Sequence, residues 1–126
     1  MNKNKMMFYI YISIMLIAVT SGQILLKYSI SSMGEIPSNI SGISSFILTA
    51  LLKPMVIASL LLAFIGSLAW ISAISKADLS FAYPFSVLSY VFILIFSSLI
   101  LKEHISILRW IGVIIIGIGV FIVSRS

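Results

Sequence analysis

The sequence predicts an all-α integral membrane protein with four transmembrane helices, and two observations support this prediction. The 126-residue chain is 61% hydrophobic and only 9% charged, with a mean hydropathy of +1.24, so it lacks the polar surface of a water-soluble domain. Four apolar runs fill most of it, and about 20 helical residues at about 1.5 Å each match a hydrocarbon layer of about 30 Å. We therefore expect one multi-pass domain over residues 1–126.

The four runs are almost free of charge. Residues 6–26, 55–75 and 79–101 contain no charged residue, and residues 105–124 contain only Arg109, near their start. The first run is too long for a cleaved signal peptide, and polar residues follow it, so we expect a permanent first helix. The expected spans cover about residues 6–28, 54–75, 79–101 and 105–124.

Residues 29–53 form the only long connection. Gly34, Pro37 and several serines predict a loop in its first half. Its second half, residues 43–52, has apolar residues at helical spacing and is either an interfacial helix or an extension of the second span. Pro54 suits the first turn of that span. The remaining connections are short, so both termini should lie on one side.

Composition also excludes several functions. The chain has no cysteine, one histidine and three acidic residues, which predicts no metal site, redox centre or other cofactor. No soluble domain remains to hold an enzyme. The net charge of +5 lies in termini and short connections, so we expect contacts with lipid headgroups rather than nucleic acid.

Charge does not orient the helices clearly, because each expected side of the membrane holds four basic residues. Three arrangements remain open: an antiparallel homodimer, a paralogous partner that sets the orientation, or ordinary insertion with the N-terminus in the cytoplasm. Four helices make a thin wall around a pathway, so we expect a dimer in each case. The two sets are Lys3, Lys5, Lys76 and Arg125, and Lys27, Lys53, Lys102 and Arg109.

Polar residues at the end of the first run are candidates for substrate binding. Gln23 and Lys27 lie four residues apart on one helix face, with Thr20 one turn earlier. In a cavity, the Lys27 ammonium and the Gln23 amide suit an anionic head such as a phosphate. Alternatively, Lys27 extends to the interface and Gln23 bonds a neighbouring helix.

The third run contains a second set of candidates. Pro84 removes one backbone hydrogen bond and predicts a bend. Tyr83, Ser86 and Tyr90 follow helical spacing on one face, and bent membrane helices often hold substrate groups in transporters. The alternative is a helix-packing face of aromatic and small residues.

The turn before the fourth run holds Glu103, and the run itself holds Gly112 and Gly119. Glu103 either caps the last helix, accepts Arg109 or binds a cationic substrate group, and the structural role is favoured. Asp78 is expected to be a turn or cap residue. Gly112 and Gly119 lie seven residues apart on one face and predict a dimer seam.

Three short segments are similar to the small multidrug resistance proteins of the drug/metabolite transporter superfamily. They are Leu26 to Ser29, Phe81 to Tyr83, and Gly112 with Gly119. The resemblance implies an antiparallel dimer of four-helix chains. It also implies a membrane-embedded glutamate in drug exporters, but Val19 occupies that position here, which argues against proton-coupled export of cations.

A second branch of the superfamily resembles the chain more closely. Ser21-Gly22-Gln23 followed by Lys27, Ala82-Tyr83-Pro84, and Lys102-Glu103-His104 are similar to segments of aminoarabinose-phosphoundecaprenol flippase subunits. Trp110 to Gly112 resembles the last helix of EamA-type transporters, of which this chain would be half. The resemblance implies a bacterial cytoplasmic membrane protein that moves a polyprenyl-phosphate-linked sugar between leaflets. Asp78 and the long connection depart from these patterns.

The leading hypothesis is therefore a transporter or flippase subunit that works by alternating access. It pairs with itself or a paralogue around a cavity lined by the first and third spans. The alternatives are an exporter of small amphipathic or cationic solutes, in which Glu103 supplies the acid, and a non-transporting membrane subunit of a larger complex.

Overall fold

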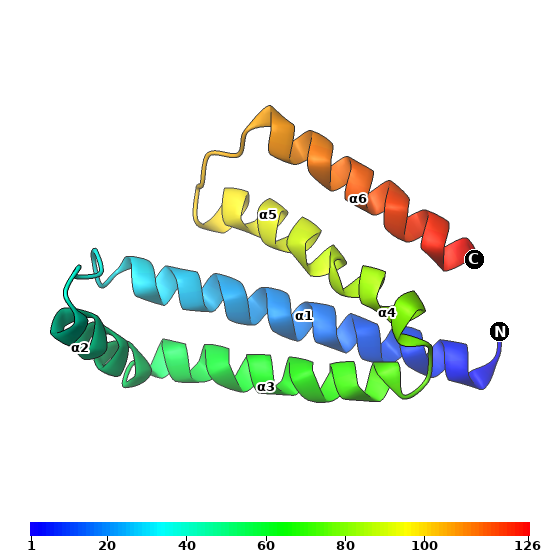
Figure 1. Ribbon diagram of the computed structural model, residues 1–126, viewed down its shortest axis with the longest axis horizontal. Helices are drawn as coiled ribbons and strands as arrows, with labels where there is room; N and C mark the ends of the chain where they lie inside the picture. Colours follow the sequence, from blue (N-terminus) through cyan, green and yellow to red (C-terminus); the bar gives the residue numbers. More distant parts are fainter.

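The computed structural model describes residues 1–126 and contains helices and connections but no strand. Four stretches are long and apolar enough to cross a membrane, which confirms the all-α class with four spans. Figure 1 shows both termini at the same end of the bundle. The helices are α1 (Lys3–Ser31), α2 (Ile40–Leu51), α3 (Pro54–Ile74), α4 (Leu79–Ser86), α5 (Leu88–Ile100) and α6 (Ile107–Arg125).

The first helix, α1, is longer than the membrane needs. It has 29 residues, or about 43 Å at about 1.5 Å per residue, against a hydrocarbon layer of about 30 Å. It begins and ends beyond the expected span of residues 6–28. At its start, the Asn2 side chain accepts the backbone N–H of Asn4 at 3.3 Å. Both ends of α1 therefore reach the headgroup layers.

The helices α1 and α3 lie antiparallel and form the closest helix pair (Figure 1). Glycines permit this approach: a Cβ atom on Gly22 would lie 3.1 Å from the Ser59 carbonyl oxygen, and one on Gly66 would lie 2.8 Å from Cγ2 of Val19. Close packing of small residues is the main source of helix association in lipid, where apolar burial contributes little. The α1–α3 pair is thus the rigid base of the fold.

A separate helix, α2, occupies the second half of the long connection. It ends at Leu51, and α3 begins at Pro54, which lies in the first turn as predicted. Figure 1 shows α2 set across the end of the α1–α3 pair rather than in line with α3. Among its twelve residues only Ala50 is buried. Its place and its uncharged, partly apolar surface suit the membrane interface.

The third span is divided into α4 and α5 at Val87. Pro84 lies within α4 and supplies no N–H. Beyond it, the Ser86 hydroxyl donates to the Tyr83 carbonyl at 2.7 Å and the Ser89 hydroxyl donates to the Ser86 carbonyl at 2.8 Å. These are the carbonyls that the N–H groups of Val87 and Tyr90 would use in a regular α-helix.

Those two N–H groups bond one residue closer instead. The Val87 N–H donates to the Pro84 carbonyl at 3.2 Å, and the Tyr90 N–H donates to the Val87 carbonyl at 3.0 Å. Serine hydroxyls that bond back to the helix commonly bend it, and proline adds to the effect. The expected span of residues 79–101 is therefore one crossing made of two helices.

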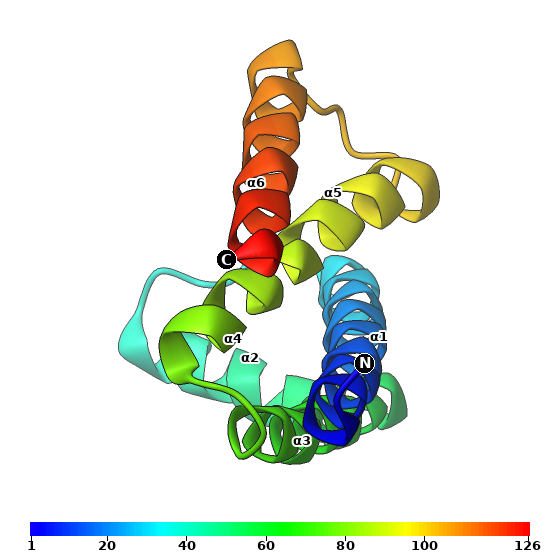
Figure 2. The same cartoon turned by 90° about the vertical axis from the view of Figure 1, so that its right-hand side faces the viewer.

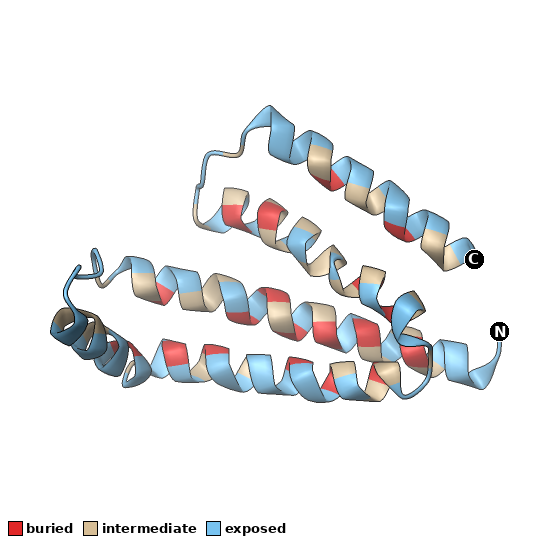
Figure 3. Ribbon diagram, in the orientation of Figure 1, coloured by how far each residue is buried: buried red, intermediate tan, exposed pale blue.

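The last helix, α6, is loosely attached. Ser106 caps it by accepting the Arg109 N–H at 3.4 Å, so α6 begins two residues later than the expected residue 105. Figure 2 shows α6 on the far side of α4 and α5 from α3. Only Val113 and Val120 are buried along it, and Figure 3 shows the rest of its surface largely exposed.

The main cluster of buried side chains lies near the end that holds the termini. Only 19 of 126 residues are buried, so a large apolar surface faces lipid or a partner chain. An aromatic group made of Phe8, Phe81 and Phe85 joins α1 to α4, with ring centroids 5.2–5.5 Å apart. The other end of the bundle is more open. The main buried cluster is Phe8, Ile12, Met15, Ala69, Ala73, Ala82, Phe85 and Val120.

Candidate functional site

A polar cavity of about 230 Å³ lies at the end of the bundle away from the termini, where α1, α5 and α6 meet. We call it the head-group pocket. Four of the expected substrate-binding residues line it: Gln23, Lys27, Tyr90 and Glu103. The full lining is Gln23, Ile24, Lys27, Tyr90, Ile93, Leu94, Ser97, Leu101, Glu103, Ile105 and Arg109.

The helix α1 supplies the amide and one cation. Gln23 and Lys27 lie one turn apart on the wall of the pocket, and both are exposed. Lys27 is near the end of α1, so its ammonium lies at the membrane boundary, while Gln23 lies about 6 Å deeper. No acidic side chain lies within 4.0 Å of Lys27. Its charge is therefore free for a substrate.

The connection between α5 and α6 supplies the acid. Lys102 adopts a left-handed conformation with φ 55°, which non-glycine residues seldom take. The N–H groups of Leu101 and Glu103 both donate to the Ser97 carbonyl, at 3.1 and 3.3 Å. This helix-ending turn is of the kind that commonly closes α-helices. It folds the chain back so that Glu103 lines the pocket.

Arg109 completes the pocket from the first turn of α6. The sequence suggested it only as a partner for Glu103, but no charge pair within 4.0 Å joins the two. Both side chains instead line the pocket with Lys27. Its lone position in an otherwise uncharged span was a signal, because charged residues within membrane helices are usually functional.

The remaining candidates lie elsewhere. Tyr83 is 60% exposed, and its ring packs edge-on against Trp70 at 5.9 Å. The Ser86 hydroxyl donates a hydrogen bond to the Tyr83 carbonyl of its own helix. The division at Val87 separates these two residues from Tyr90, so the expected common face does not form one binding wall.

Thr20 lines a different space from Gln23 and Lys27. It is 6% exposed, and its Oγ1 atom is buried without a hydrogen-bond partner. It lies where two apolar cavities of about 400 and 530 Å³ meet along α1 and α5. We call these two cavities together the apolar groove. Thr20, Ser21 and Phe96 line both of its parts.

The apolar groove reaches the head-group pocket. Ile24 lines both the pocket and the nearer part of the groove. The groove extends along α1 from Ser13 to Tyr28, which is about 22 Å at the helical rise. The head-group pocket at the membrane boundary therefore adjoins the apolar groove within the membrane.

The two glycines of the expected dimer seam have free space beside their Cα atoms. A Cβ atom on Gly112 or Gly119 would meet no atom within 4 Å. No helix of the same chain therefore approaches them, and the dimer seam stays a prediction. Nor do the histidine and the acidic residues gather anywhere into a group of three or more that could hold a metal ion.

The chemistry of the pocket suits a charged, hydroxyl-bearing head. Lys27 and Arg109 provide two cations, and guanidinium groups bind phosphate through two parallel hydrogen bonds. Gln23 and Tyr90 both donate and accept hydrogen bonds, and the Glu103 carboxylate accepts them. A phosphate with attached hydroxyl or amino groups satisfies this set.

Comparisons with known proteins agree with a transport role. Residues 4–125 match the model of the EamA-like transporter family. The chain is 33% identical over 61 residues to the probable 4-amino-4-deoxy-L-arabinose-phosphoundecaprenol flippase subunit ArnE of Pseudomonas fluorescens, covering 48% of this chain and 54% of that protein.

A second relative gives the same picture. The probable subunit of the same name from Pseudomonas savastanoi pathovar phaseolicola is 31% identical over 62 residues, covering 49% of this chain and 54% of that protein. The match thus spans about half the length of these curated relatives. No solved structure matches the chain significantly.

Proposed function

Because the chain belongs to the EamA-like transporter family, we propose that it is a flippase subunit that moves a polyprenyl-phosphate-linked sugar, or a similar lipid-linked polar head, between leaflets. It is a multi-pass protein of the cytoplasmic membrane with four spans. Both relatives described above are named as flippase subunits for such a lipid. The substrate and the partner are the proposed part.

The observation that carries the proposal is the meeting of Lys27 and Arg109 in one pocket at the membrane boundary. The two residues come from α1 and α6 and have no acidic partner within 4.0 Å. Two unpaired cations that line the same pocket repel each other, and an anion between them relieves the repulsion. A phosphate head supplies that anion, with Gln23 as a further hydrogen-bond donor.

The apolar groove gives the lipid chain a place. It adjoins the head-group pocket through Ile24, and its lining is almost wholly apolar apart from small hydroxyl side chains. The chain of the substrate can remain in this groove while only the head crosses. This arrangement explains how a protein with so few polar residues handles a large lipid.

A second chain completes the pathway. The four spans are mostly exposed, and α6 buries only Val113 and Val120. One chain therefore does not enclose a cavity across the membrane. We propose a dimer with a second copy or a paralogue, with Gly112 and Gly119 at the seam. The two units then alternate the access of the pocket between the membrane faces.

One observation favours a second candidate function. Glu103 lines the head-group pocket, and a carboxylate there suits a small cationic solute. Lys27 and Arg109 oppose this use, because two positive charges outweigh one negative charge in the same pocket. Export of cationic compounds therefore ranks below movement of an anionic head.

The proposal is tested by reconstituting the protein in liposomes and following a fluorescent polyprenyl-phosphate sugar from one leaflet to the other. We expect the wild type to move the lipid and Lys27→Met or Gln23→Leu to abolish movement, while insertion in the membrane stays normal. Lys53→Met is the matched control, since Lys53 lies at the same end of the bundle and bonds Ser32 at 3.4 Å outside the pocket.

Three results would count against the proposal. Normal movement by both Lys27→Met and Gln23→Leu would remove the head-group assignment. Uptake of a cationic dye by the wild type, lost in Glu103→Gln, would favour the solute exporter. No movement of either probe, even with a paralogous partner added, would favour a non-transporting subunit.

A further inference from the structure

We propose that the chain carries a second lipid-phosphate site, in a polar cavity at the membrane face opposite the head-group pocket. This inference rests on the proposed function and extends it: the same lipid head would bind here before or after it crosses the membrane. The cavity measures about 560 Å³ and lies where α1, the α3–α4 turn and the end of α6 meet. Its lining is Lys5, Phe8, Lys76, Ala77, Asp78, Ser80, Phe81, Val123 and Ser126.

The position of this terminal pocket matches the opposite membrane boundary. Lys5 and Lys27 both lie in α1, and their 22-residue separation in the sequence corresponds to about 33 Å along the helix. The hydrocarbon layer is about 30 Å thick. A pocket beside Lys5 and a pocket beside Lys27 therefore lie one at each face of the membrane.

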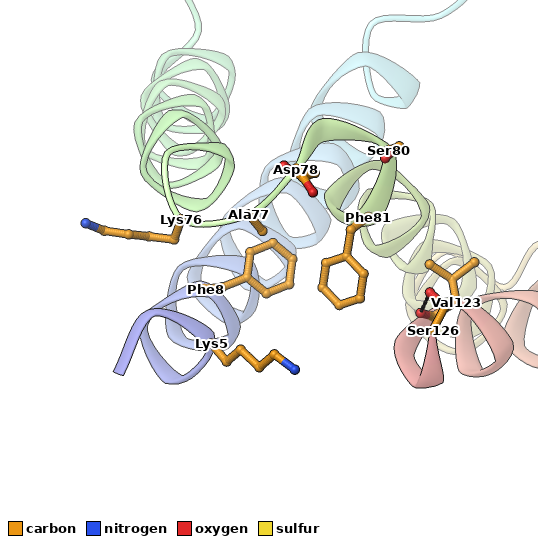
Figure 4. A pocket seen from close by; sticks show the side chains of 9 residues that line it. All are labelled: Lys5, Phe8, Lys76, Ala77, Asp78, Ser80, Phe81, Val123 and Ser126. Carbon is orange, nitrogen blue, oxygen red and sulfur yellow. Dashed lines mark hydrogen bonds between the residues drawn. The ribbon is translucent and has the colours of Figure 1, made fainter. Parts of the chain in front are cut away.

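The charges of the terminal pocket favour an anion. Lys5 and Lys76 line it with a single acid, Asp78, and no opposite charges lie within 4.0 Å of one another. Figure 4 shows the Lys5 side chain extending below the Phe8 and Phe81 rings, while the Lys76 ammonium points to the outer side. The net charge of these three residues is positive; Lys5 extends beneath the rings, whereas Lys76 reaches a head in the pocket only by turning inward.

Acidic and hydroxyl groups on the rim fit the rest of a lipid head. Figure 4 shows Asp78 and Ser80 on the side of the rings opposite Lys5. The side chain of Asp78 makes no capping bond to α4, so it can accept hydrogen bonds from hydroxyl or amino groups. The head-group pocket has the same pairing of two cations with one acid.

An aromatic floor distinguishes a lipid phosphate from a free phosphate. Phe8 is only 1% exposed, and its ring lies 5.5 Å from that of Phe81. The partly buried Phe81 and Val123 give the polar pocket an apolar base, and the buried Phe8 ring packs behind Phe81. The first carbons of a lipid chain can lie on this base, whereas inorganic phosphate gains nothing from it.

The two pockets mark the two ends of the proposed route, with one polar site at each face. A head released from Lys27 and Arg109 meets Lys5 after it has crossed, and Lys76 joins it by turning inward.

The test counts lipid-phosphate molecules bound per chain by native mass spectrometry, with geranylgeranyl phosphate as the probe. We expect about two molecules on the wild type and about one on Lys5→Gln/Lys76→Gln. Lys3→Gln is the matched control, because Lys3 lies one turn or less from Lys5 in α1 but does not line the pocket. Lys27→Met should lose the other molecule.

The variants separate this inference from the proposed function. Loss of binding in Lys27→Met alone, with Lys5→Gln/Lys76→Gln unchanged, would overturn the terminal site and leave the head-group pocket intact. Loss only in Lys5→Gln/Lys76→Gln would support the terminal site and remove the head-group assignment. An equal loss in Lys3→Gln, or displacement by inorganic phosphate, would overturn a specific lipid site.

Discussion

At the scale of residues, the head-group pocket depends on a few side chains whose neighbours leave them free. Gln23 and Lys27 were predictable as a pair, because residues four apart share a helix face whatever the fold. Arg109 was not predictable as their partner, because helical spacing carries no information about which helices meet. Its contribution rests on the packing of α6 beside α5.

Arg109→Gln should weaken binding of geranylgeranyl phosphate about tenfold or more. Hydrogen bonds to charged groups contribute about 1.5–3 kcal/mol, and about 1.4 kcal/mol corresponds to tenfold in affinity. Isothermal titration in detergent measures the change. Arg125→Gln is the control, since Arg125 stacks on Phe121 at 5.2 Å outside the pocket; an equal effect of both substitutions would indicate only general charge attraction.

Thr20→Val should leave the free energy of unfolding unchanged or raise it by about 1–2 kcal/mol. The Thr20 hydroxyl is buried without a partner, and burying an unpaired polar group costs roughly 1–3 kcal/mol. Valine keeps the shape and removes the polar atom. Unfolding in mixed detergent measures the effect, and a loss of stability would show that the hydroxyl has a partner in the assembled protein.

At the scale of elements, the division between α4 and α5 is the most consequential feature. Pro84 alone predicted a bend, but the place of the division depends on two serine hydroxyls. They occupy the Tyr83 and Ser86 carbonyls and displace the backbone bonds of Val87 and Tyr90. This division also separates Tyr83 and Ser86 from the pocket that Tyr90 lines.

Ser86→Ala/Ser89→Ala should make the third span more regular and slow transport. Without the hydroxyls, the Tyr83 and Ser86 carbonyls become free to accept the N–H groups of Val87 and Tyr90. Hydrogen exchange should become slower at these amides. Ser67→Ala is the control, because Ser67 makes the same type of bond, at 2.9 Å, in the undivided helix α3; unchanged exchange in the double variant would assign the division to Pro84 alone.

At the scale of the whole molecule, the proposed transport pathway needs a second chain. The closely packed pair of α1 and α3 forms a base, whereas α6 has broad exposed apolar surface. Exposed apolar surface is normal in lipid, so it does not by itself prove a partner. The partner is inferred from the two polar pockets, since a single chain encloses no path between them.

Gly119→Leu should reduce dimerisation several-fold while the single chain stays folded. Nothing lies within 4 Å of a Cβ atom at Gly119, so leucine meets no clash within the chain, but it would hold a partner helix away. Energy transfer between labelled chains in liposomes measures the loss. Gly22→Leu is the contrasting variant: Gly22 packs on the Ser59 carbonyl, so the fold itself should fail.

Dimerisation of Gly119→Leu at the wild-type level would place the seam elsewhere on the chain. The thermal stability of the variant in detergent must match the wild type for this comparison to hold. A loss of both stability and dimerisation would instead assign Gly119 to contacts within the chain.

The sequence by itself determined the class, the four spans, the pairing of Gln23 with Lys27 and the bend near Pro84. These follow from composition and from spacing along one helix, which are local properties. Only the tertiary structure decided that Arg109 and Glu103 join Lys27, that Thr20 lies in an apolar groove, and that Lys5 and Lys76 flank a second pocket. These contacts depend on how the helices pack side by side in lipid. Small residues and the displaced backbone hydrogen bonds of the third span decide which helices approach one another, and an apolar sequence gives little indication of which helices will be neighbours.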